Sequence, residues 1–99
     1  MAPMTTVRVT YWRDIPVLVT ARDERDEVTV PLPPAFQDLV DRVAVQDGVT
    51  DADAYLAEWR VGPDQPRSEP ARAAAAALVD ALAAEIEPLR ARYLGGPPI

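Results

Sequence analysis

Hydrophobic and polar residues alternate in two neighbouring segments of the first third of the chain, 6–12 and 15–21. This period of two is typical of strands with one buried face. Only two residues separate the segments, which favours an antiparallel hairpin, and 27–32 follows as a third strand after a charged turn. The sequence therefore predicts a three-stranded antiparallel meander. The apolar residues expected on one face of each strand are Val7, Val9 and Tyr11, then Ile15, Val17 and Val19, then Val28 and Val30.

The spacing changes to that of helices after Pro33 and Pro34. Apolar residues led by Phe36 recur every three or four positions and predict a helix over 34–47, which Gly48 would end. Thr50 to Asp53 resembles a capping box, so a second helix is predicted over 51–60. Its inward side chains would be Tyr55, Leu56 and Trp59.

The last third of the chain is predicted to be a helical arm. Residues 60–68 read as an exposed linker, and Ser68 is a candidate cap for a third helix over 69–94. Pro88 should kink or interrupt that helix, and the alanine run at 73–77 offers little to pack. Its apolar stripe is Leu78, Leu82, Ile86, Leu89 and Tyr93.

Length and composition indicate one small folded domain of the α+β class. The 99 residues are 48% hydrophobic and 26% charged, which is ordinary for a globular protein. We predict a core domain at 1–62, a linker at 63–68, a helical arm at 69–94 and a disordered tail at 95–99. The net charge of −6 argues against nucleic acid and anionic membranes as partners. The N-terminus resembles no signal peptide, so a cytoplasmic location is expected.

The residue types limit the available chemistry. Histidine, cysteine and lysine are absent, which excludes the usual catalytic triads, thiolate and imidazole metal sites, and Schiff bases. No glycine-rich phosphate-binding loop occurs. The acidic stretches at 23–27 and 47–53 are interpreted as turn and capping carboxylates rather than as a calcium site. No catalytic residue, metal or cofactor is therefore predicted.

One short run, YWRDIP at 11–16, has two interpretations. In the first, helices cover Trp12, while Arg13 and Asp14 pair with each other or with the turn backbone. In the second, Trp12 and Arg13 anchor a partner, since tryptophan and arginine are enriched in interface hot spots.

Three blocks carry a family resemblance: YWRDIP, then PPAFQDLVDRVA, then DADAYLAEWR. Together they resemble the bacterial virulence factor domain family over residues 7–60. The resemblance implies an accessory module, found fused to helical-repeat and iron-sulfur-scaffold-like modules or accompanying one-carbon and corrinoid methyl-transfer genes. It supplies no catalytic residue. The matched motif residues are Tyr11, Trp12, Arg13, Asp14, Pro16, Tyr55, Glu58, Trp59 and Arg60.

Three hypotheses for function follow. The first is a non-enzymatic accessory domain that binds a protein partner through Trp12, Arg13 and the neighbouring helix end. The second is a small-molecule or enzyme-subunit role, in which Arg13 and Arg60 hold a carboxylate or phosphate that Asp14 or Glu58 orients. The third is a homodimer formed through an exposed strand edge or the stripe at 78–93.

Overall fold

The predicted meander is present in the structure, a computed structural model that describes residues 4–49 and 51–95. Its strands are β1 (Thr5–Trp12), β2 (Ile15–Arg22) and β3 (Glu27–Pro31). β1 pairs antiparallel with β2, and β2 pairs antiparallel with β3. The fold class is α+β, as the sequence predicted.

The sheet has two further strands that the sequence did not predict. β4 (Trp59–Val61) and β5 (Gln65–Arg67) both pair antiparallel with β1, so the sheet order is β3-β2-β1-β4, with β5 also on β1. The prediction of an exposed linker at 63–68 is therefore wrong for β5. Three-residue strands carry almost no periodic signal, and these two exist because the free edge of β1 offers hydrogen-bonding partners.

A register shift lies between Thr10 and Tyr11 of β1. Thr10 pairs with Leu18, whereas Tyr11 pairs with Pro16, so one residue of β2 is passed over. Paired residues point to the same face of a sheet. Ile15 therefore shares a face with its partner Trp12 rather than with Val19, which corrects the predicted alternation of β2.

The helix led by Phe36 forms as predicted, as α1 (Pro34–Gln46). Gly48 has a φ of 71°, and its N–H donates to Val45 O at 3.2 Å, while Val49 N donates to Ala44 O at 2.8 Å. These two bonds satisfy the last carbonyls in the glycine-terminated arrangement that the sequence indicated. One face of α1 is buried in the core.

The second helix, α2 (Ala52–Ala57), is shorter than predicted because the chain enters β4 at Trp59. Asp51 is its N-cap residue without a capping side-chain bond, and Thr50 of the proposed capping box lies outside the described residues. Leu56 is 63% exposed, so its predicted inward orientation is wrong. Tyr55 and Trp59 are half-buried against the core, as predicted.

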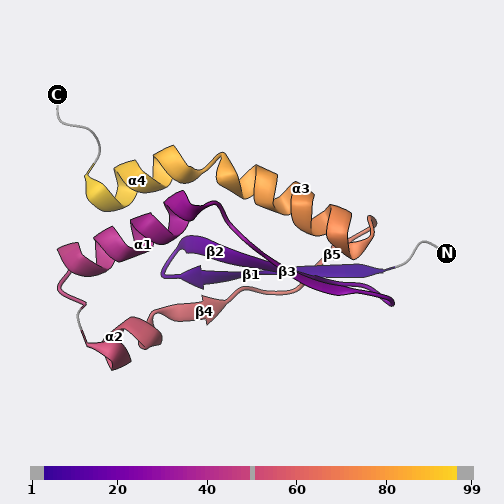
Figure 1. The fold of residues 1–99 in the computed structure, drawn as a ribbon, viewed down its shortest axis with the longest axis horizontal. Helices are drawn as coiled ribbons and strands as arrows, with labels where there is room; N and C mark the ends of the chain where they lie inside the picture. The colour runs from indigo at the N-terminus through magenta and orange to yellow at the C-terminus, as the bar shows by residue number, and fades with distance from the viewer. Residues whose placement is uncertain (1–3, 50, 96–99) are drawn as a thin grey trace.

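The predicted C-terminal helix is two helices, α3 (Ala71–Ala83) and α4 (Ile86–Leu94). The interruption expected near Pro88 lies earlier, at Ala84 and Glu85. Pro88 is then the third residue of α4, where its missing N–H costs no helical hydrogen bond. Figure 1 shows α3 and α4 end to end on one side of the β1–β2 hairpin, with α2 and β4 on the other. Of the predicted tail at 95–99, Gly95 is the C-cap residue of α4, with a φ of 80°, and 96–99 lie outside the described residues.

The alanine-rich helix α3 packs closely on the sheet, contrary to the prediction that it offers little to pack. Ala71, Ala74 and Ala75 are buried, and α3 contacts β1, β2 and β3. Small side chains let the helix approach the strands closely. The buried core contains Val7, Val9, Trp12, Ile15, Val17, Val19, Ala21, Leu32, Phe36, Leu39, Val40, Val43, Ala44, Ala71, Ala74 and Ala75.

The start of α3 is fixed by Asp23 in the turn between β2 and β3, not by the predicted cap Ser68. Ala71 N donates to Asp23 Oδ2 at 2.8 Å, while Asp23 Oδ1 accepts from the N–H groups of Arg25 and Asp26. These backbone bonds, that from Ala71 foremost, lower the pKa of Asp23. The carboxylate of Asp23 thus joins the turn to the start of α3. This confirms for Asp23 the interpretation of the stretch 23–27 as turn and capping carboxylates.

Candidate functional site

The YWRDIP run forms the tip of the β1–β2 hairpin. Arg13 and Asp14 connect the strands, and Arg13 has a φ of 55°. A non-glycine residue in this left-handed region costs about 1–2 kcal/mol and persists only where the surroundings hold it. Arg13 N donates to Glu58 O at 2.9 Å, which ties the strained residue to the end of α2.

Trp12 points to the side of the sheet that α2 covers. Its side chain is 0% exposed, and its Nε1 donates to Tyr55 O at 3.1 Å. The Tyr55 ring lies 5.5 Å from the Trp12 ring and 6.2 Å from the Trp59 ring, centroid to centroid. We call Trp12, Tyr55 and Trp59 the aromatic cluster. Because Trp12 is sealed inside it, the interpretation in which helices cover this residue is correct on that point. Its second part is wrong, because Arg13 pairs with Asp47 and Glu58, whereas Asp14 pairs with Arg60 and Arg92.

The Arg13 guanidinium lies over the Trp12 ring and is held by two carboxylates. Its Nη1 donates to Asp47 Oδ2, its Nε lies 3.4 Å from Glu58 Oε2, and its carbon Cζ lies 4.8 Å from the ring centroid. The hydrogen bond to Asp47 raises the pKa of Arg13, and the same bond lowers the pKa of Asp47. Arg13 thereby fastens the hairpin to the ends of α1 and α2.

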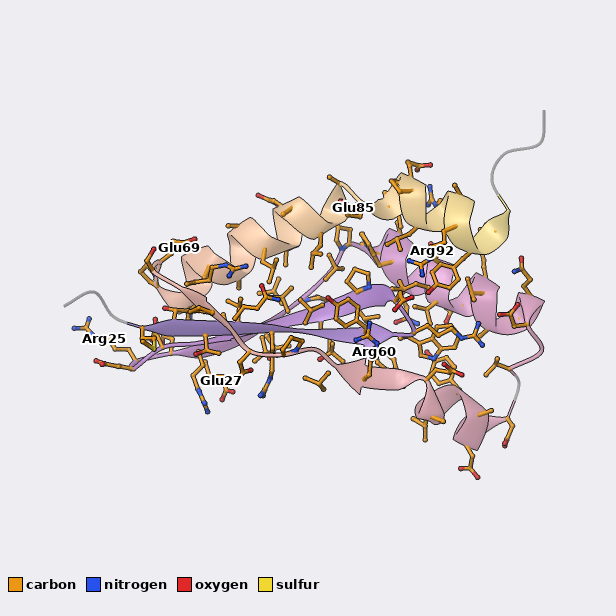
Figure 2. The ribbon with its side chains drawn as sticks, turned by 180° about the vertical axis from the view of Figure 1, so that it is seen from behind. Arg25, Glu27, Arg60, Glu69, Glu85 and Arg92 are labelled. Carbon is orange, nitrogen blue, oxygen red and sulfur yellow. The ribbon has the colours of Figure 1, made fainter. Side chains whose placement is uncertain are left out.

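Asp14 points to the other side, toward α4. Its Oδ1 accepts from Arg60 Nη2 at 3.0 Å, and its Oδ2 accepts from Arg92 Nη2 at 2.9 Å. Asp14 N donates to the Tyr93 hydroxyl at 3.1 Å. In Figure 2, Arg60 on β4 and Arg92 on α4 flank the hairpin end. We call Arg60, Asp14 and Arg92 the arginine bridge.

Tyr11 and Arg60 are paired residues on the same face of the sheet. Arg60 Cζ lies 4.4 Å from the Tyr11 ring centroid, and Arg60 Nε donates to Arg13 O at 3.0 Å. Stacking and hydrogen bonding together hold the guanidinium in a defined orientation.

A groove of about 230 Å³ runs from the hairpin tip to the junction of α3 and α4. Apolar side chains form most of its lining, and three charged residues, Asp14, Glu85 and Arg92, join them. The apolar members come from two strands and two helices, β1, β2, α3 and α4: Tyr11, Pro16, Leu82, Pro88 and Leu89. Aliphatic and aromatic walls with a few charged groups are typical of a binding groove.

The structure divides the predicted site residues between two sides. On the α2 side, Trp12 and Trp59 belong to the aromatic cluster, and Arg13 and Glu58 pair with each other. The predicted residues on the groove side are Tyr11, Asp14 and Arg60. The expectation that Trp12 offers a contact surface is therefore wrong.

Sequence reasoning missed three participants. Asp47 comes from the end of α1, and Arg92 and Tyr93 come from α4. In the sequence, Tyr93 is only the last member of an apolar stripe. That stripe is the one signal that could have revealed these residues, because it predicts that the helix carrying Tyr93 packs on the core, and Arg92 is the neighbouring residue.

Within 4–49 and 51–95, no three carboxylates gather in a group that could hold a metal ion. The guanidinium groups of Arg13, Arg60 and Arg92 each contact a carboxylate of the chain itself. In the same ranges, no helix has the length and apolar character needed to cross a bilayer.

The fold and site define a small α+β domain in which one hairpin tip is fixed by the aromatic cluster around the buried Trp12 and borders an open groove. The model of the Virulence factor family matches residues 10–94, so the chain belongs to this family. The match includes α3 and α4, which the resemblance over 7–60 left out. Searches of curated proteins and of solved structures gave no match.

Proposed function

We propose that this domain is a non-enzymatic accessory module that binds a protein partner through the groove beside YWRDIP. The groove itself carries the proposal, because it is apolar, open to solvent and bordered by the conformationally fixed hairpin tip. A rigid groove recognises a partner with little loss of conformational entropy. The sequence predicts Trp12 and Arg13 as the anchor of the partner. Because Trp12 is buried and Arg13 is paired with Asp47 and Glu58, the contacts that we propose are Tyr11, Pro16 and Leu89 instead.

Affinity capture from extracts of the source cells tests the proposal. Leu89→Arg places a charge inside the groove, and we expect it to abolish retention of the specific partner. Leu56→Arg is the matched control, since it makes the same change on α2, away from the groove, where Leu56 is 63% exposed. Proteins retained by the native chain and Leu56→Arg but lost with Leu89→Arg would support the proposal. Identical captured proteins for all three would contradict it.

Circular dichroism and urea unfolding are needed for each variant, because Leu89 is half-buried against the core. If Leu89→Arg unfolds, Leu89→Gln is the smaller polar replacement. Partner loss counts only for a variant that unfolds at a urea concentration close to that of the native chain.

A second candidate function is binding of a small carboxylate or phosphate compound. It is favoured by the arginine bridge, in which two guanidinium groups meet one carboxylate. Arg13 and Glu58 are no longer part of this candidate, because they pair with each other. Thermal unfolding with folate, corrinoid and nucleotide ligands tests it, since a ligand that binds the folded state raises the melting temperature. An unchanged melting temperature with every ligand would remove this candidate.

A further inference from the structure

Asp14 shows which chemical group the two arginines of the arginine bridge can bind. The two oxygens of Asp14 are divided between them, Oδ1 to Arg60 and Oδ2 to Arg92. This arrangement fits a planar carboxylate held from two sides by charge-assisted hydrogen bonds. The side chains of Arg60, Asp14 and Arg92 are 51%, 46% and 63% exposed, so solvent or a ligand can reach all three.

Both arginines keep donors for a further acceptor. Within residues 4–49 and 51–95, Arg92 donates only from Nη2, and Arg60 donates from Nε and Nη2. A guanidinium has five N–H donors, so several remain open on each. Two positive charges also face the single negative charge of Asp14. An incoming carboxylate can therefore bind the free donors or replace the Asp14 side chain.

The groove adds a second requirement to the occupant. Arg92 and Leu89 line the same groove, as do Tyr11 and Pro16. A partner must then carry a carboxylate next to a large apolar side chain. The last residue of a polypeptide meets this requirement when it is apolar, because its carboxylate and side chain share one α-carbon.

Glu85, which also lines the groove, restricts the charge of the occupant. Its carboxylate repels a second negative charge and can accept a peptide N–H group. A singly charged chain end is consequently favoured over a phosphate, which carries up to two negative charges near neutral pH.

We infer that the groove and the arginine bridge together bind the C-terminal end of a partner protein whose last residue is large and apolar. Asp14 occupies the carboxylate position when the partner is absent. The inference rests on the proposed function and adds the chemistry of the partner to it.

Nuclear magnetic resonance titration of the ¹⁵N-labelled chain tests the inference with defined probes. N-acetyl-alanyl-leucine presents a chain end with a free carboxylate, and its C-terminal amide removes only the charge. N-acetyl-aspartyl-leucinamide carries an internal carboxylate, and acetate carries the charge without the apolar group. We expect the free acid to bind at least about tenfold more tightly than the other three, with shifts at the Arg60 and Arg92 Nε–H signals.

Substitutions locate the binding. Arg92→Gln should weaken the free acid about tenfold by removing charge-assisted hydrogen bonds. Arg90→Gln is the matched control on the same helix, because Arg90 pairs with Glu87 and should leave the affinity unchanged. Asp14→Asn should tighten binding severalfold, since the internal competitor loses its charge. Unaltered urea unfolding confirms that each variant is folded.

Each contrary result has a definite meaning. Equal affinity for the amide overturns carboxylate recognition, and equal affinity for the aspartyl probe overturns recognition of the chain end. Acetate binding as tightly as the dipeptide assigns the site to a small acid and also overturns the inference. If none of these probes binds selectively while Leu89→Arg still loses its cellular partner, the inference fails but the proposed function stands. If Leu89→Arg also keeps every partner, both fail.

Discussion

The two sides of the hairpin tip carry similar residues, but these residues are covered on one side and partly exposed on the other. On the α2 side, Trp12 is sealed under Tyr55, and Arg13 is held by Asp47 and Glu58. On the α4 side, Tyr11 and Asp14 stay within reach of solvent beside the groove. Trp12 and Arg13 are covered and hold the hairpin tip in place, whereas Tyr11 and Arg60 on the groove side are the aromatic residue and the arginine that we propose for recognition. Neighbouring positions in one motif can therefore have different roles because a strand directs successive side chains to opposite faces.

Trp12→Ala should have the largest effect on stability, because it disrupts the packing on the covered, α2 side of the hairpin tip. It removes the largest fully buried side chain and the hydrogen bond to Tyr55 O. We expect the free energy of unfolding in urea to fall by about 3–5 kcal/mol. Trp59→Ala is the comparison, and its half-buried ring should cost less. Equal losses would show that Trp12 is not the centre of the aromatic cluster.

Arg13→Ala and Arg13→Gly separate the side chain of Arg13 from its backbone. Both remove the ion pairs to Asp47 and Glu58, but glycine adopts the φ of 55° without strain. The glycine variant should therefore be more stable than the alanine variant by about 1 kcal/mol in urea unfolding. An alanine variant at least as stable as glycine would argue that the turn carries no strain.

Because Arg13 and Asp47 are paired, the free energy of unfolding should depend on pH in the acid range. The hydrogen bond from Arg13 lowers the pKa of Asp47 in the folded state below the ordinary value of 3.8. Its contribution to stability is thus present above that ordinary value and is lost as the pH falls through the folded pKa. In Arg13→Ala the pKa of Asp47 should return toward 3.8, which reduces this acid-dependent loss. Carboxyl titration by nuclear magnetic resonance measures the shift, and an identical Asp47 titration in both proteins would refute the pairing.

Arg92→Gln should have the smallest effect on stability and would sharpen the contrast between the two sides. The ion pair to Asp14 is exposed, and such pairs contribute at most about 1 kcal/mol. We expect the unfolding midpoint in urea to remain close to that of Arg90→Gln. A loss approaching that of Trp12→Ala would mean that the arginine bridge holds the fold together, and the groove side would then be structural.

The sequence alone determined the elements whose signal is local. The alternation at 6–12 and 15–21 and the helical spacing after Phe36 each depend on residues a few positions apart, and all three elements formed. The same alternation placed Trp12 opposite Tyr11, which the pairing of the strands bears out. The family, too, was recognisable from YWRDIP and the blocks that follow it.

Only the tertiary structure decided which distant segments pack against those elements. β4 and β5 are too short to show a period and form because β1 offers them an edge. Asp14 binds Arg92 across 78 positions, and Arg13 binds Asp47 across 34. A side chain's local spacing fixes the face it occupies, whereas its partner is set by which distant segment packs there. For that reason the sequence identified the hairpin tip as a candidate site, but the packing of α2 and α4 decided which side is covered and which is open.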